Sequence, residues 1–512
     1  MLSLPICVKS LRRFLNSKLR RHKLSISIIR CKMHSAALEV EKISDIEIVQ
    51  VESTSLTWLH KVAPAFPIDG SKIKIIYEPS EFYFTLLEKC KFAKKRITLA
   101  SLYLGTGKLE QELVNSIKHA IENNNGNIEV NILLDYMRGS RGKFNSKEML
   151  KSLLNEKYKK CCQAYLYHTP RLRGLFKTFI PDRFNELIGL QHMKLYIFDN
   201  TLIISGANLS NDYFNNRQDR YFMIEDCKEL CDFYCDLVQN ITDFSFQLLP
   251  DGNTSFSTKV KSHPFKSPSN EFTQEAADRI LNLFQTEMDK RSELYKTEIP
   301  KADTWIFPLV QMGQLNIRHD SEITLKLLQT APSGATLRLA TGYFNLTTEY
   351  KNALVNACQA DCHVLTAHPK ANGFFGARGV AGGIPAAYTK IEESFFKLCE
   401  QMQQNSRIRL WEYVKPGWTY HAKGLWYSMP GQQRPSFTLI GSPNFGYRSV
   451  KRDLETQIAI ATKNEELRNR LQKEQERLFD CAKSVTESTF LQKERLPPAW
   501  VRMAVFFFRY YF

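Results

Sequence analysis

The sequence predicts an α/β protein made of two similar halves. In the first half, strand-like segments alternate with segments of helical periodicity, and this β-α-β-α-β order is typical of a mostly parallel sheet between helices. The segment ATLRLATGYF (335–344) matches KRITLASLYL (95–104), which indicates an internal duplication. The pattern H-x-K also occurs twice, each time followed by a turn reading Gly-Ala-Asn or Gly-Ser-Pro-Asn. A single site built from both pairs requires the halves to face each other at their strand ends.

The predicted elements of the first half begin at residue 73. A short strand over 73–77 precedes a helix that starts at Pro79, since proline is accepted in the first turn, and runs to about residue 95. Residues 96–103 and 128–134 are predicted as further strands. Between them, apolar residues recur at every fourth position and predict one face of a helix: Leu109, Leu113, Ile117 and Ile121.

The second half repeats this order, with a helix near 350–357 and a strand near 362–367. From the matched tyrosine to the motif histidine there are 89 residues in the first half and 78 in the second, counted from Tyr103 and Tyr343. This agreement in length supports the duplication.

Residues 248–271 are the most linker-like interior stretch, because proline, glycine, asparagine and serine gather there. We place a domain boundary near residue 260. The expected organisation is a leader (1–38), a loosely defined connecting segment (39–70), two domains (71–260 and 261–495) and an aromatic C-terminal segment (496–512).

The formal charge of +17 over 512 residues is unevenly distributed. No acidic residue precedes Glu39, whereas nine lysines and arginines lie before it, among leucines, isoleucines and serines. This composition is typical of a mitochondrial transit peptide, and a basic arm that binds nucleic acid is the alternative.

We expect no membrane-spanning helix, because no charge-free apolar window reaches 18 residues. The C-terminal residues 500–512 combine aromatic side chains with two arginines. They fit either an anchor in the membrane interface or a terminal element packed on the domain.

The twelve cysteines do not predict a metal site or a disulfide framework. Cys227, Cys231 and Cys235 are spaced by four, and Cys358 and Cys362 repeat that spacing. Zinc sites use closer pairs and need a fourth ligand, so we expect buried, reduced thiols on helices.

The first motif places His192 and Lys194 two residues apart in a β-branched and aromatic stretch, so in a strand both project from one face. Asp199 completes the spacing H-x-K-x4-D. A glycine turn then brings the Asn208 amide and the Ser210 hydroxyl back to the same edge.

The second motif supplies His421 and Lys423, followed by Ser442 and Asn444, but its acidic position holds Ser428. Cleavage of a phosphodiester needs a nucleophile, cations or amides for the oxygens, and a proton for the leaving group. Two histidines can divide the first and third tasks. The lysines and asparagines can hold the oxygens.

These paired motifs resemble the phospholipase D superfamily, and GANLSNDYFNNRQDRY after the first motif resembles its mitochondrial phosphatidylglycerophosphate synthases, over about residues 70–485. The resemblance implies two phospholipase D-like α-β-α domains with one active site at their interface. It implies a phosphohistidine intermediate, no metal and no cofactor. It also implies catalytic roles for five residues and phosphate binding by four: His192, Lys194, Asp199, His421 and Lys423, and Asn208, Ser210, Ser442 and Asn444.

Because the second motif lacks its acid, we expect His192 to be the nucleophile and His421 the general acid/base. The implied reaction transfers the phosphatidyl group of CDP-diacylglycerol to sn-glycerol 3-phosphate, releasing CMP, in phosphatidylglycerol and cardiolipin synthesis. The implied location is the matrix side of the mitochondrial inner membrane, with an anionic membrane surface and no nucleic acid as partner. Open alternatives are phosphatidylserine synthase or a phospholipase of the same superfamily, a nucleic-acid phosphodiesterase, and a non-catalytic relative.

Two carboxylates follow the motif asparagines at the same distance. Asp219 and Glu455 each lie eleven residues further on. They either orient a histidine of their own or the opposite half, or form surface salt bridges with Arg220 or Arg452.

Three weaker signals complete the set. A basic and aromatic tract over 171–183 fits an anionic bilayer or stacked nucleic-acid bases, and the family resemblance favours lipid. Residues Gly105, Thr106, Gly107 and Lys108 form an incomplete phosphate loop, for which a simple strand-to-helix turn is the preferred interpretation. Candidates for the acceptor phosphate are Arg138, Arg141, Lys143 and Arg217.

Overall fold

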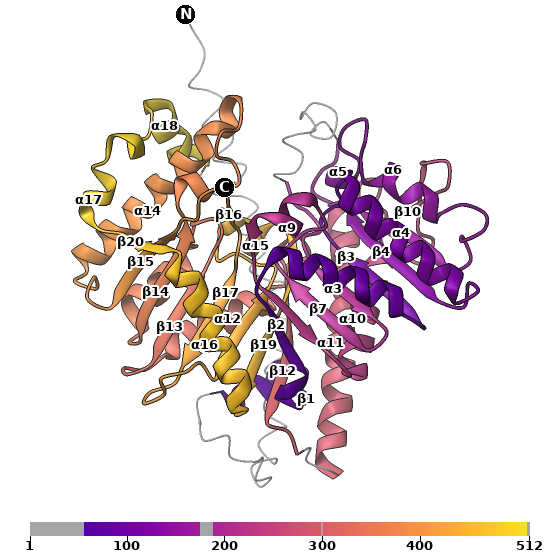
Figure 1. Ribbon diagram of the computed structural model, residues 1–512, viewed down its shortest axis with the longest axis horizontal. Helices are drawn as coiled ribbons and strands as arrows, with labels where there is room; N and C mark the ends of the chain where they lie inside the picture. The colour runs from indigo at the N-terminus through magenta and orange to yellow at the C-terminus, as the bar shows by residue number, and fades with distance from the viewer. Residues whose placement is uncertain (1–55, 175–187, 298–300, 509–512) are drawn as a thin grey trace, which may run out of the picture. The chain divides into compact units, whose positions relative to one another are not determined.

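The computed structural model describes residues 56–174, 188–297 and 301–508, so the predicted leader and most of the basic tract lie outside the described residues. Its core is a pair of nine-stranded sheets, one for each half of the sequence (Figure 1). The first sheet runs, in spatial order, β11 (Thr254–Phe256), β10 (Phe246–Leu248), β5 (Cys162–Tyr167), β4 (Glu129–Asp135), β3 (Arg96–Ala100), β6 (Leu195–Phe198), β7 (Thr201–Ser205), β9 (Tyr221–Ile224) and β2 (Ile73–Ile76).

Eight of the nine strands of the second sheet repeat this plan, whereas its edge strand β1 and the edge strand β11 of the first sheet have no counterpart. It runs β1 (Phe66–Ile68), β12 (Thr304–Met312), β19 (Leu454–Thr462), β18 (Phe437–Gly441), β17 (Gly424–Ser428), β13 (Thr336–Ala340), β14 (Asp361–Ala367), β15 (Ile408–Tyr413) and β20 (Ala482–Ser484). In each sheet three neighbouring strands are parallel and antiparallel strands flank them, so the predicted mostly parallel sheet is only partly correct: β3, β4 and β5 in the first and β13, β14 and β15 in the second.

Helices pack on both faces of each sheet. On the first half these are α3 (Pro79–Phe92), α4 (Lys108–Asn123), the short α5 (Tyr136–Gly139), α6 (Ser146–Leu150) and α9 (Asn211–Asn215), and the longer α10 (Lys228–Asp243) and α11 (Ser269–Thr297). On the second half they are α12 (His319–Thr330), α13 (Thr348–Asn352), α14 (Ile384–Gln401), α15 (Tyr447–Lys451), α16 (Glu465–Asp480), α17 (Glu487–Phe490) and α18 (Ala499–Phe508).

The predicted elements are confirmed, with shorter bounds at several ends. The apolar stripe of α4 is buried from Leu113 to Ile121, as its four-residue spacing requires. The helix near 350–357 is α13 followed by one π-helical turn. The ten cysteines within the described residues are buried or half-buried as expected, but Cys362 lies on β14 and not on a helix.

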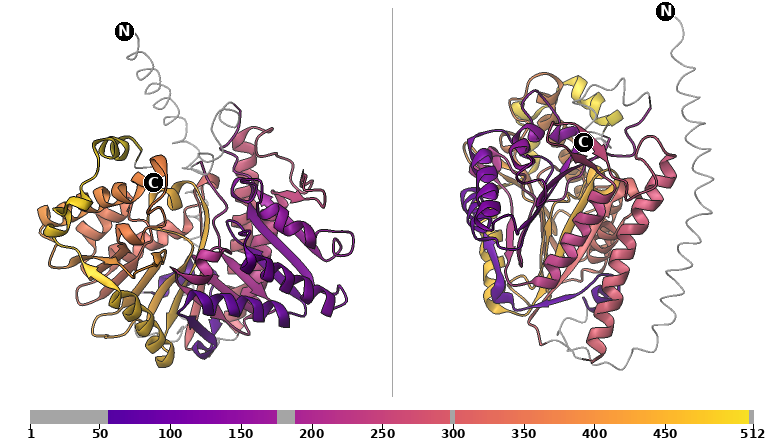
Figure 2. Two further views of the ribbon diagram at one scale, coloured as in Figure 1. Left: turned by 45° about the horizontal axis from the view of Figure 1, so that its top comes forward. Right: turned by 90° about the vertical axis from the view of Figure 1, so that its right-hand side faces the viewer.

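The two halves share one apolar core. A single buried cluster includes Ile204 and Phe222 of the first sheet together with Ile440 and Ile458 of the second. Helix α11 follows the linker-like stretch yet packs along α10 of the first half (Figure 2), and β1 of the connecting segment joins the second sheet. The chain therefore crosses between halves twice, which fixes their relative position.

A two-stranded pairing also joins the halves where the motifs meet. β8 (Arg217–Gln218) of the first half lies parallel to β16 (Thr419–Tyr420) of the second. Both strands lie directly beside chemistry-bearing residues, since Asp219 follows β8 and His421 follows β16.

Candidate active site

The two His–Lys pairs occupy equivalent places just before an antiparallel strand. His192 and Lys194 precede β6, and His421 and Lys423 precede β17, in extended segments and not within the strands themselves. Each lysine Nζ donates to the carbonyl oxygen of its histidine at 2.7 Å. Both lysines are fully buried, so each motif carries a cation to the inside of the interface.

The glycine that opens each turn explains how the strands approach so closely. A Cβ on Gly206 would lie 2.7 Å from Asp219 Oδ1, and one on Gly441 would lie 2.4 Å from the Cα of Gln457. Neither space accepts a side chain. The turns therefore require glycine for packing beside the site.

Each histidine is held by a carboxylate from the opposite half. His192 Nδ1 donates to Glu455 Oε2 at 2.9 Å, and His421 Nδ1 donates to Asp219 Oδ2 at 2.6 Å. This crossed arrangement decides between the alternatives left open by the sequence. It leaves Nε2 as the reactive nitrogen of both rings and makes the site incomplete in either half alone.

Burial and charge set the ionisation of the carboxylates. Burial opposes the charged form of Glu455, but His192 and Lys194 outweigh it and lower its pKa to about 2. Burial raises the pKa of Asp219 to about 6, although Lys423 opposes the shift. The two orienting acids thus titrate in different pH ranges.

The basic groups are shifted in the same environment. Burial lowers the pKa of Lys423 to about 8 and that of Lys194 well below its usual range. Burial, Lys423 and Arg217 hold the pKa of His421 well below its usual value. Burial also lowers the pKa of His192, but the nearby Glu455 carboxylate counteracts this shift.

The two reactive nitrogens differ in access. The His192 side chain is 13% exposed, against 5% for His421. His421 Nε2 lies 3.2 Å from the Tyr213 hydroxyl, and Asn208 Nδ2 donates to that hydroxyl at 3.1 Å. Among the described residues, none is recorded as a hydrogen-bond partner of His192 Nε2.

The four predicted phosphate-binding residues have different hydrogen-bond partners and lie at different positions relative to the histidines. Asn208 reaches His421 through Tyr213, as above. Ser210 Oγ lies 3.0 Å from the Tyr103 hydroxyl. Ser442 Oγ accepts from Thr456 N at 3.2 Å, and its side chain also hydrogen-bonds Glu455, the carboxylate that holds His192. Asn444 Oδ1 accepts from Thr341 Oγ1 and Gly342 N, both at 3.1 Å, and so orders the turn after β13.

Asp199 lies at the far end of β6, in the tight turn to β7. Its carboxylate accepts from the backbone N–H groups of Lys94, Lys95 and Arg96 at 2.7–3.0 Å. Its φ of 53° suits an aspartate in a turn. The structure therefore gives Asp199 a place in the strand framework, away from the histidines.

The incomplete phosphate loop is filled from within the chain. Glu110, in the first turn of α4, accepts from Asn211 N at 2.6 Å. A Cβ on Gly105 or Gly107 would lie 2.3 Å or 2.6 Å from its carboxylate oxygens. A carboxylate already occupies this helix start, so the loop is a strand-to-helix turn and not an anion site.

A buried ion pair that the sequence did not reveal lies beside the site. Arg220 donates to both oxygens of Glu474 on α16, at 2.8 and 2.9 Å, and to Lys423 O at 3.2 Å. Its guanidinium stacks on Trp426 at 3.8 Å. Arg220 thus links the first half to the segment that carries the second motif, across 254 positions of sequence.

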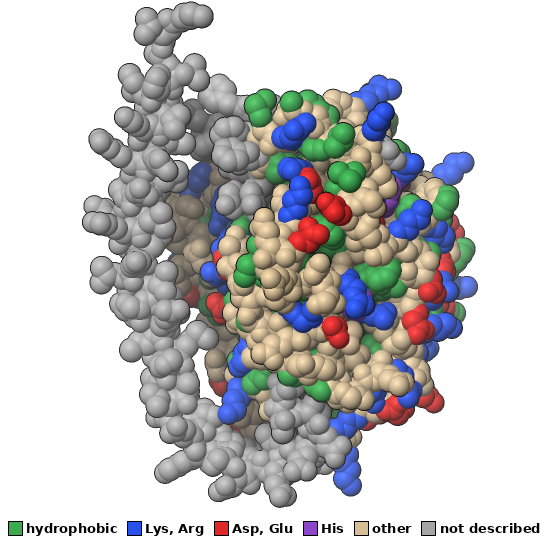
Figure 3. Space-filling model, turned by 90° about the vertical axis from the view of Figure 1, so that its left-hand side faces the viewer, with side chains coloured by type: hydrophobic (Ala, Val, Ile, Leu, Met, Phe, Trp, Pro, Cys, Tyr) green, Lys and Arg blue, Asp and Glu red, His purple; other side chains and the backbone are tan. Residues whose placement is uncertain are grey.

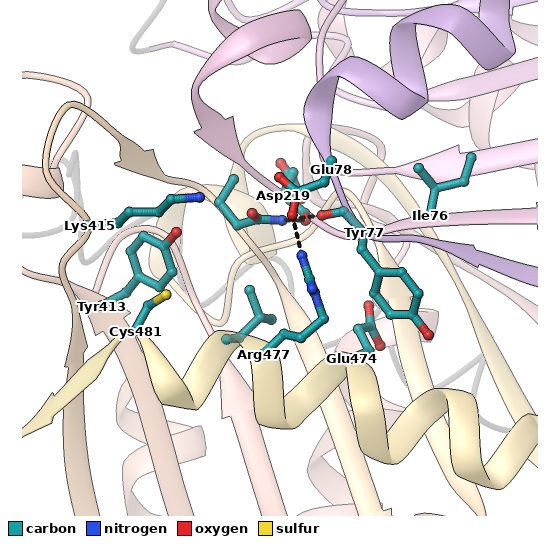
Figure 4. A pocket seen from close by; sticks show the side chains of 11 residues that line it. Ile76, Tyr77, Glu78, Asp219, Tyr413, Lys415, Glu474, Arg477 and Cys481 are labelled. Atoms are coloured by element: carbon teal, nitrogen blue, oxygen red, sulfur yellow. Dashed lines mark hydrogen bonds and ion pairs between the residues drawn. The ribbon is translucent and has the colours of Figure 1, made fainter.

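Next to this pair, a pocket opens along the seam between the halves (Figure 4). Arg477 of α16 and Glu78, before α3, form an ion pair across it. Asp219 also lines the pocket. The carboxylate that holds His421 therefore borders the seam as well as the histidine cluster.

One cluster has the composition of a metal site. His192, Asp453 and Glu455 each offer a ligand atom within 4.8 Å of the others. Asp453, however, accepts from Leu190 N at 3.0 Å and from Arg448 Nε at 2.9 Å, while Glu455 accepts from His192. These donors and the buried Lys194 already balance the carboxylates.

Known proteins share this architecture. Residues 86–240 match a family model described as "Cardiolipin synthase, PLD-like domain". The phosphatidylserine synthase of Haemophilus influenzae superposes with a TM-score of 0.65 at 20% identity, covering 88% of this chain and 95% of that one. This second likeness supports the fold alone.

Curated relatives match over most of the chain. The mitochondrial CDP-diacylglycerol–glycerol-3-phosphate 3-phosphatidyltransferase of Homo sapiens is 44% identical over 469 residues, covering 87% of this chain and 84% of that protein. The Saccharomyces cerevisiae enzyme of the same name is 36% identical, covering 83% and 85%. The chain therefore belongs to the family of CDP-diacylglycerol–glycerol-3-phosphate 3-phosphatidyltransferases.

Proposed function

We propose that this protein transfers the phosphatidyl group of CDP-diacylglycerol to sn-glycerol 3-phosphate, giving phosphatidylglycerophosphate and CMP. The observation that carries the proposal is the crossed pairing of His192 with Glu455 and of His421 with Asp219. Two oriented imidazoles facing one buried space can perform two successive displacements at one phosphorus. The family membership supplies the substrates.

In the first displacement, His192 Nε2 attacks the lipid-side phosphorus, and the bond from that phosphorus to the CMP oxygen breaks. His192 is the better placed nucleophile because no described residue is recorded as a partner of its Nε2, whereas the Tyr213 hydroxyl and Lys423 Nζ lie 3.2 and 3.1 Å from Nε2 of His421. Lys194 and Lys423 offset the charge that develops on the oxygens.

In the second displacement, the acceptor hydroxyl attacks phosphorus, the bond to His192 breaks, and the hydroxyl proton passes to His421 Nε2. The low pKa of His421 keeps its imidazole neutral, so that Nε2 can accept the proton in this step. The departing CMP phosphate is a weak base, and the lysines offset its charge, so it can leave without receiving a proton. The first step therefore depends less on His421.

Incubation of the protein with labelled CDP-diacylglycerol and one acceptor at a time tests this function. We expect phosphatidylglycerophosphate with glycerol 3-phosphate, and little product with serine or water. Phosphatidylserine as the main product would contradict the proposal and favour the phosphatidylserine synthase alternative.

We further propose a mitochondrial location, at the matrix side of the inner membrane, with residues 1–38 as the targeting segment and a domain boundary near residue 260. The names of the relatives support the mitochondrion. A reporter fused to residues 1–45 should be imported, and a cytosolic or nuclear reporter would contradict this.

We also propose that the protein binds an anionic membrane surface through its second half and does not bind nucleic acid. No described helix combines the length and apolar composition needed to cross a bilayer. Helix α18 packs on α14 through Val501. Several large apolar side chains of the second half nevertheless stay exposed: Phe375, Val380, Leu491, Leu496, Trp500 and Met503. Figure 3 shows hydrophobic and basic groups side by side at the top of one face of the molecule.

Exposed apolar and aromatic groups with nearby cations suit the headgroup region of a bilayer. Replacement of Trp500 and Met503 by serine should therefore reduce sedimentation with vesicles of phosphatidylcholine and phosphatidylglycerol. Unchanged sedimentation would assign this face to another role.

A further inference from the structure

The two halves carry one ion pair at the same motif offset but with opposite polarity. Four and nine residues beyond the motif asparagine, the first half has Asp212 and Arg217, and the second has Arg448 and Asp453. The pairs close at 3.0 Å and 2.9 Å. Because the halves face each other, this inversion places different charges beside the two histidines.

Asp453 lies on the His192 side, within the cluster described above. Arg217 lies on the His421 side: its guanidinium stacks on Tyr213 at 4.7 Å, and the Tyr213 hydroxyl lies 3.2 Å from His421 Nε2. The nucleophile's surroundings are thus acidic, whereas those of the acid/base contain a fixed cation.

Arg217 is held firmly but is not fully neutralised. Its Nε donates to Thr419 Oγ1 at 3.0 Å and one terminal nitrogen donates to Asp212. Asp212 is 56% exposed, so solvent screens that pair, while the Arg217 side chain is 15% exposed. A further side-chain hydrogen bond links Arg217 to Tyr213, which carries no negative charge at neutral pH.

A glycine keeps the space beside this guanidinium open. A Cβ on Gly373 would lie 3.3 Å from the Tyr343 hydroxyl and 3.5 Å from NH2 of Arg217. Tyr343 in turn packs edge-on against His421 at 5.7 Å. An arginine, two tyrosines and a glycine therefore surround the approach to His421.

Displacement at phosphorus needs entering and leaving groups in line. If His192 attacks from one side, the CMP oxygen leaves on the opposite side, and the acceptor hydroxyl later enters there. Both species occupy the side of His421, and both are phosphomonoesters. Arginine matches such phosphates through paired N–H donors.

Resting on the proposed function, we propose that Arg217 forms a phosphomonoester subsite that serves twice, first for the departing CMP and then for the acceptor's own phosphate. It is a specificity-determining residue that favours a phosphorylated acceptor. Arg138 stacks on Tyr103 in the first half, and Arg448 is engaged by Asp453, so neither has the same place beside His421.

The test compares Arg217→Gln and Arg217→Lys with the natural chain. The KM for glycerol 3-phosphate should rise about 10- to 100-fold in Arg217→Gln, the loss expected for one charge-assisted contact, and less in Arg217→Lys. The concentration of CMP that half-saturates exchange of labelled CMP into CDP-diacylglycerol, without acceptor, should rise similarly. Arg434→Gln removes an exposed arginine paired with Glu465 and should change neither value.

Binding of glycerol 3-phosphate to a His192→Asn protein, with and without Arg217→Gln, gives a readout independent of turnover, and melting curves show whether the variants fold. If the KM and the CMP value stay within twofold while kcat falls, Arg217 only positions its neighbours and the proposal is wrong. A change in only one value would overturn the shared subsite. Failure of the natural chain to use glycerol 3-phosphate would instead reject the proposed function.

Discussion

The two halves share the order of eight strands, but the surroundings of their histidines differ. His192 faces two carboxylates, Glu455 and Asp453, whereas His421 has one carboxylate, Asp219, together with Tyr213 and Arg217. The duplicated fold supplies two imidazoles that each meet a carboxylate of the opposite half. The residues around the two histidines differ, and these differences favour a nucleophile on one side and a base on the other. The duplication therefore supplies both histidines, and the unlike neighbours give them different roles.

The histidines themselves give the largest expected effect. His192→Asn should abolish both steps, because no covalent intermediate can form. His421→Asn should allow one CMP per site in a rapid burst and then stop, since the acceptor hydroxyl lacks its base. Quenched-flow measurement of labelled CMP distinguishes them, and trapping of lipid phosphate on His421 would reverse the assignment.

The orienting carboxylates come next. Glu455→Gln and Asp219→Asn should each lower kcat on the order of 100-fold, because a misoriented imidazole transfers protons and attacks poorly. The pH profile sharpens the comparison. Since burial raises the pKa of Asp219 to about 6, activity should fall as the pH drops through that value and His421 loses its charged partner.

Glu455 should contribute no such limb, because its pKa is held near 2 and it stays ionised throughout. The acid limb near pH 6 should therefore vanish in Asp219→Asn and persist in Glu455→Gln. The reverse pattern in kcat against pH would show that the two carboxylates have been assigned to the wrong histidines.

The buried pair of Arg220 and Glu474 belongs to one half's site only, since Thr456 takes the equivalent place of Arg220. Arg220→Met should lower the free energy of unfolding by about 3–5 kcal/mol, because Glu474 stays buried without its cation. The double change with Glu474→Leu should recover part of this loss. Chemical denaturation of the single and double variants measures the coupling, and additive losses would contradict it.

Features that depend on neighbouring residues in the sequence could be predicted, whereas contacts between distant parts of the chain could not. The duplication, the paired motifs and the strands follow from local pattern, and the carboxylates Asp219 and Glu455 were found by equal spacing. Their crossing to opposite histidines, and the contact from Arg220 to Glu474, depend on how two sheets face each other. No periodicity in one chain encodes that arrangement.

The position of Asp199 likewise depends on more than its spacing in the motif. Its spacing from His192 fits the motif, but a strand lies between them, and the carboxylate binds the backbone at the other end. The spacing shows that Asp199 belongs to the motif. It does not show at which end of strand β6 its carboxylate lies.

The smallest expected effect compares Asp199 with Ser428. Strands β6 and β7 are joined by a two-residue turn, because Phe198 pairs with Thr201. In the second half Tyr427 pairs with Phe437, so the loop is long and no acid is needed to close it. Asp199→Ser should lower the free energy of unfolding by about 1–3 kcal/mol, since three N–H groups lose a charged acceptor and serine fits the positive φ less well.

Ser428→Ala should change the free energy of unfolding by less than about 1 kcal/mol, and Asp199→Asn should fall between the two, because asparagine accepts the same turn conformation. In all three variants kcat at a temperature well below unfolding should stay within twofold. Melting curves and kcat measured together check this. A large loss of kcat in a fully folded Asp199→Ser protein would return Asp199 to the catalytic set, and equal destabilisation by Ser428→Ala would mean that the long second loop depends on its serine as the tight first turn depends on its aspartate.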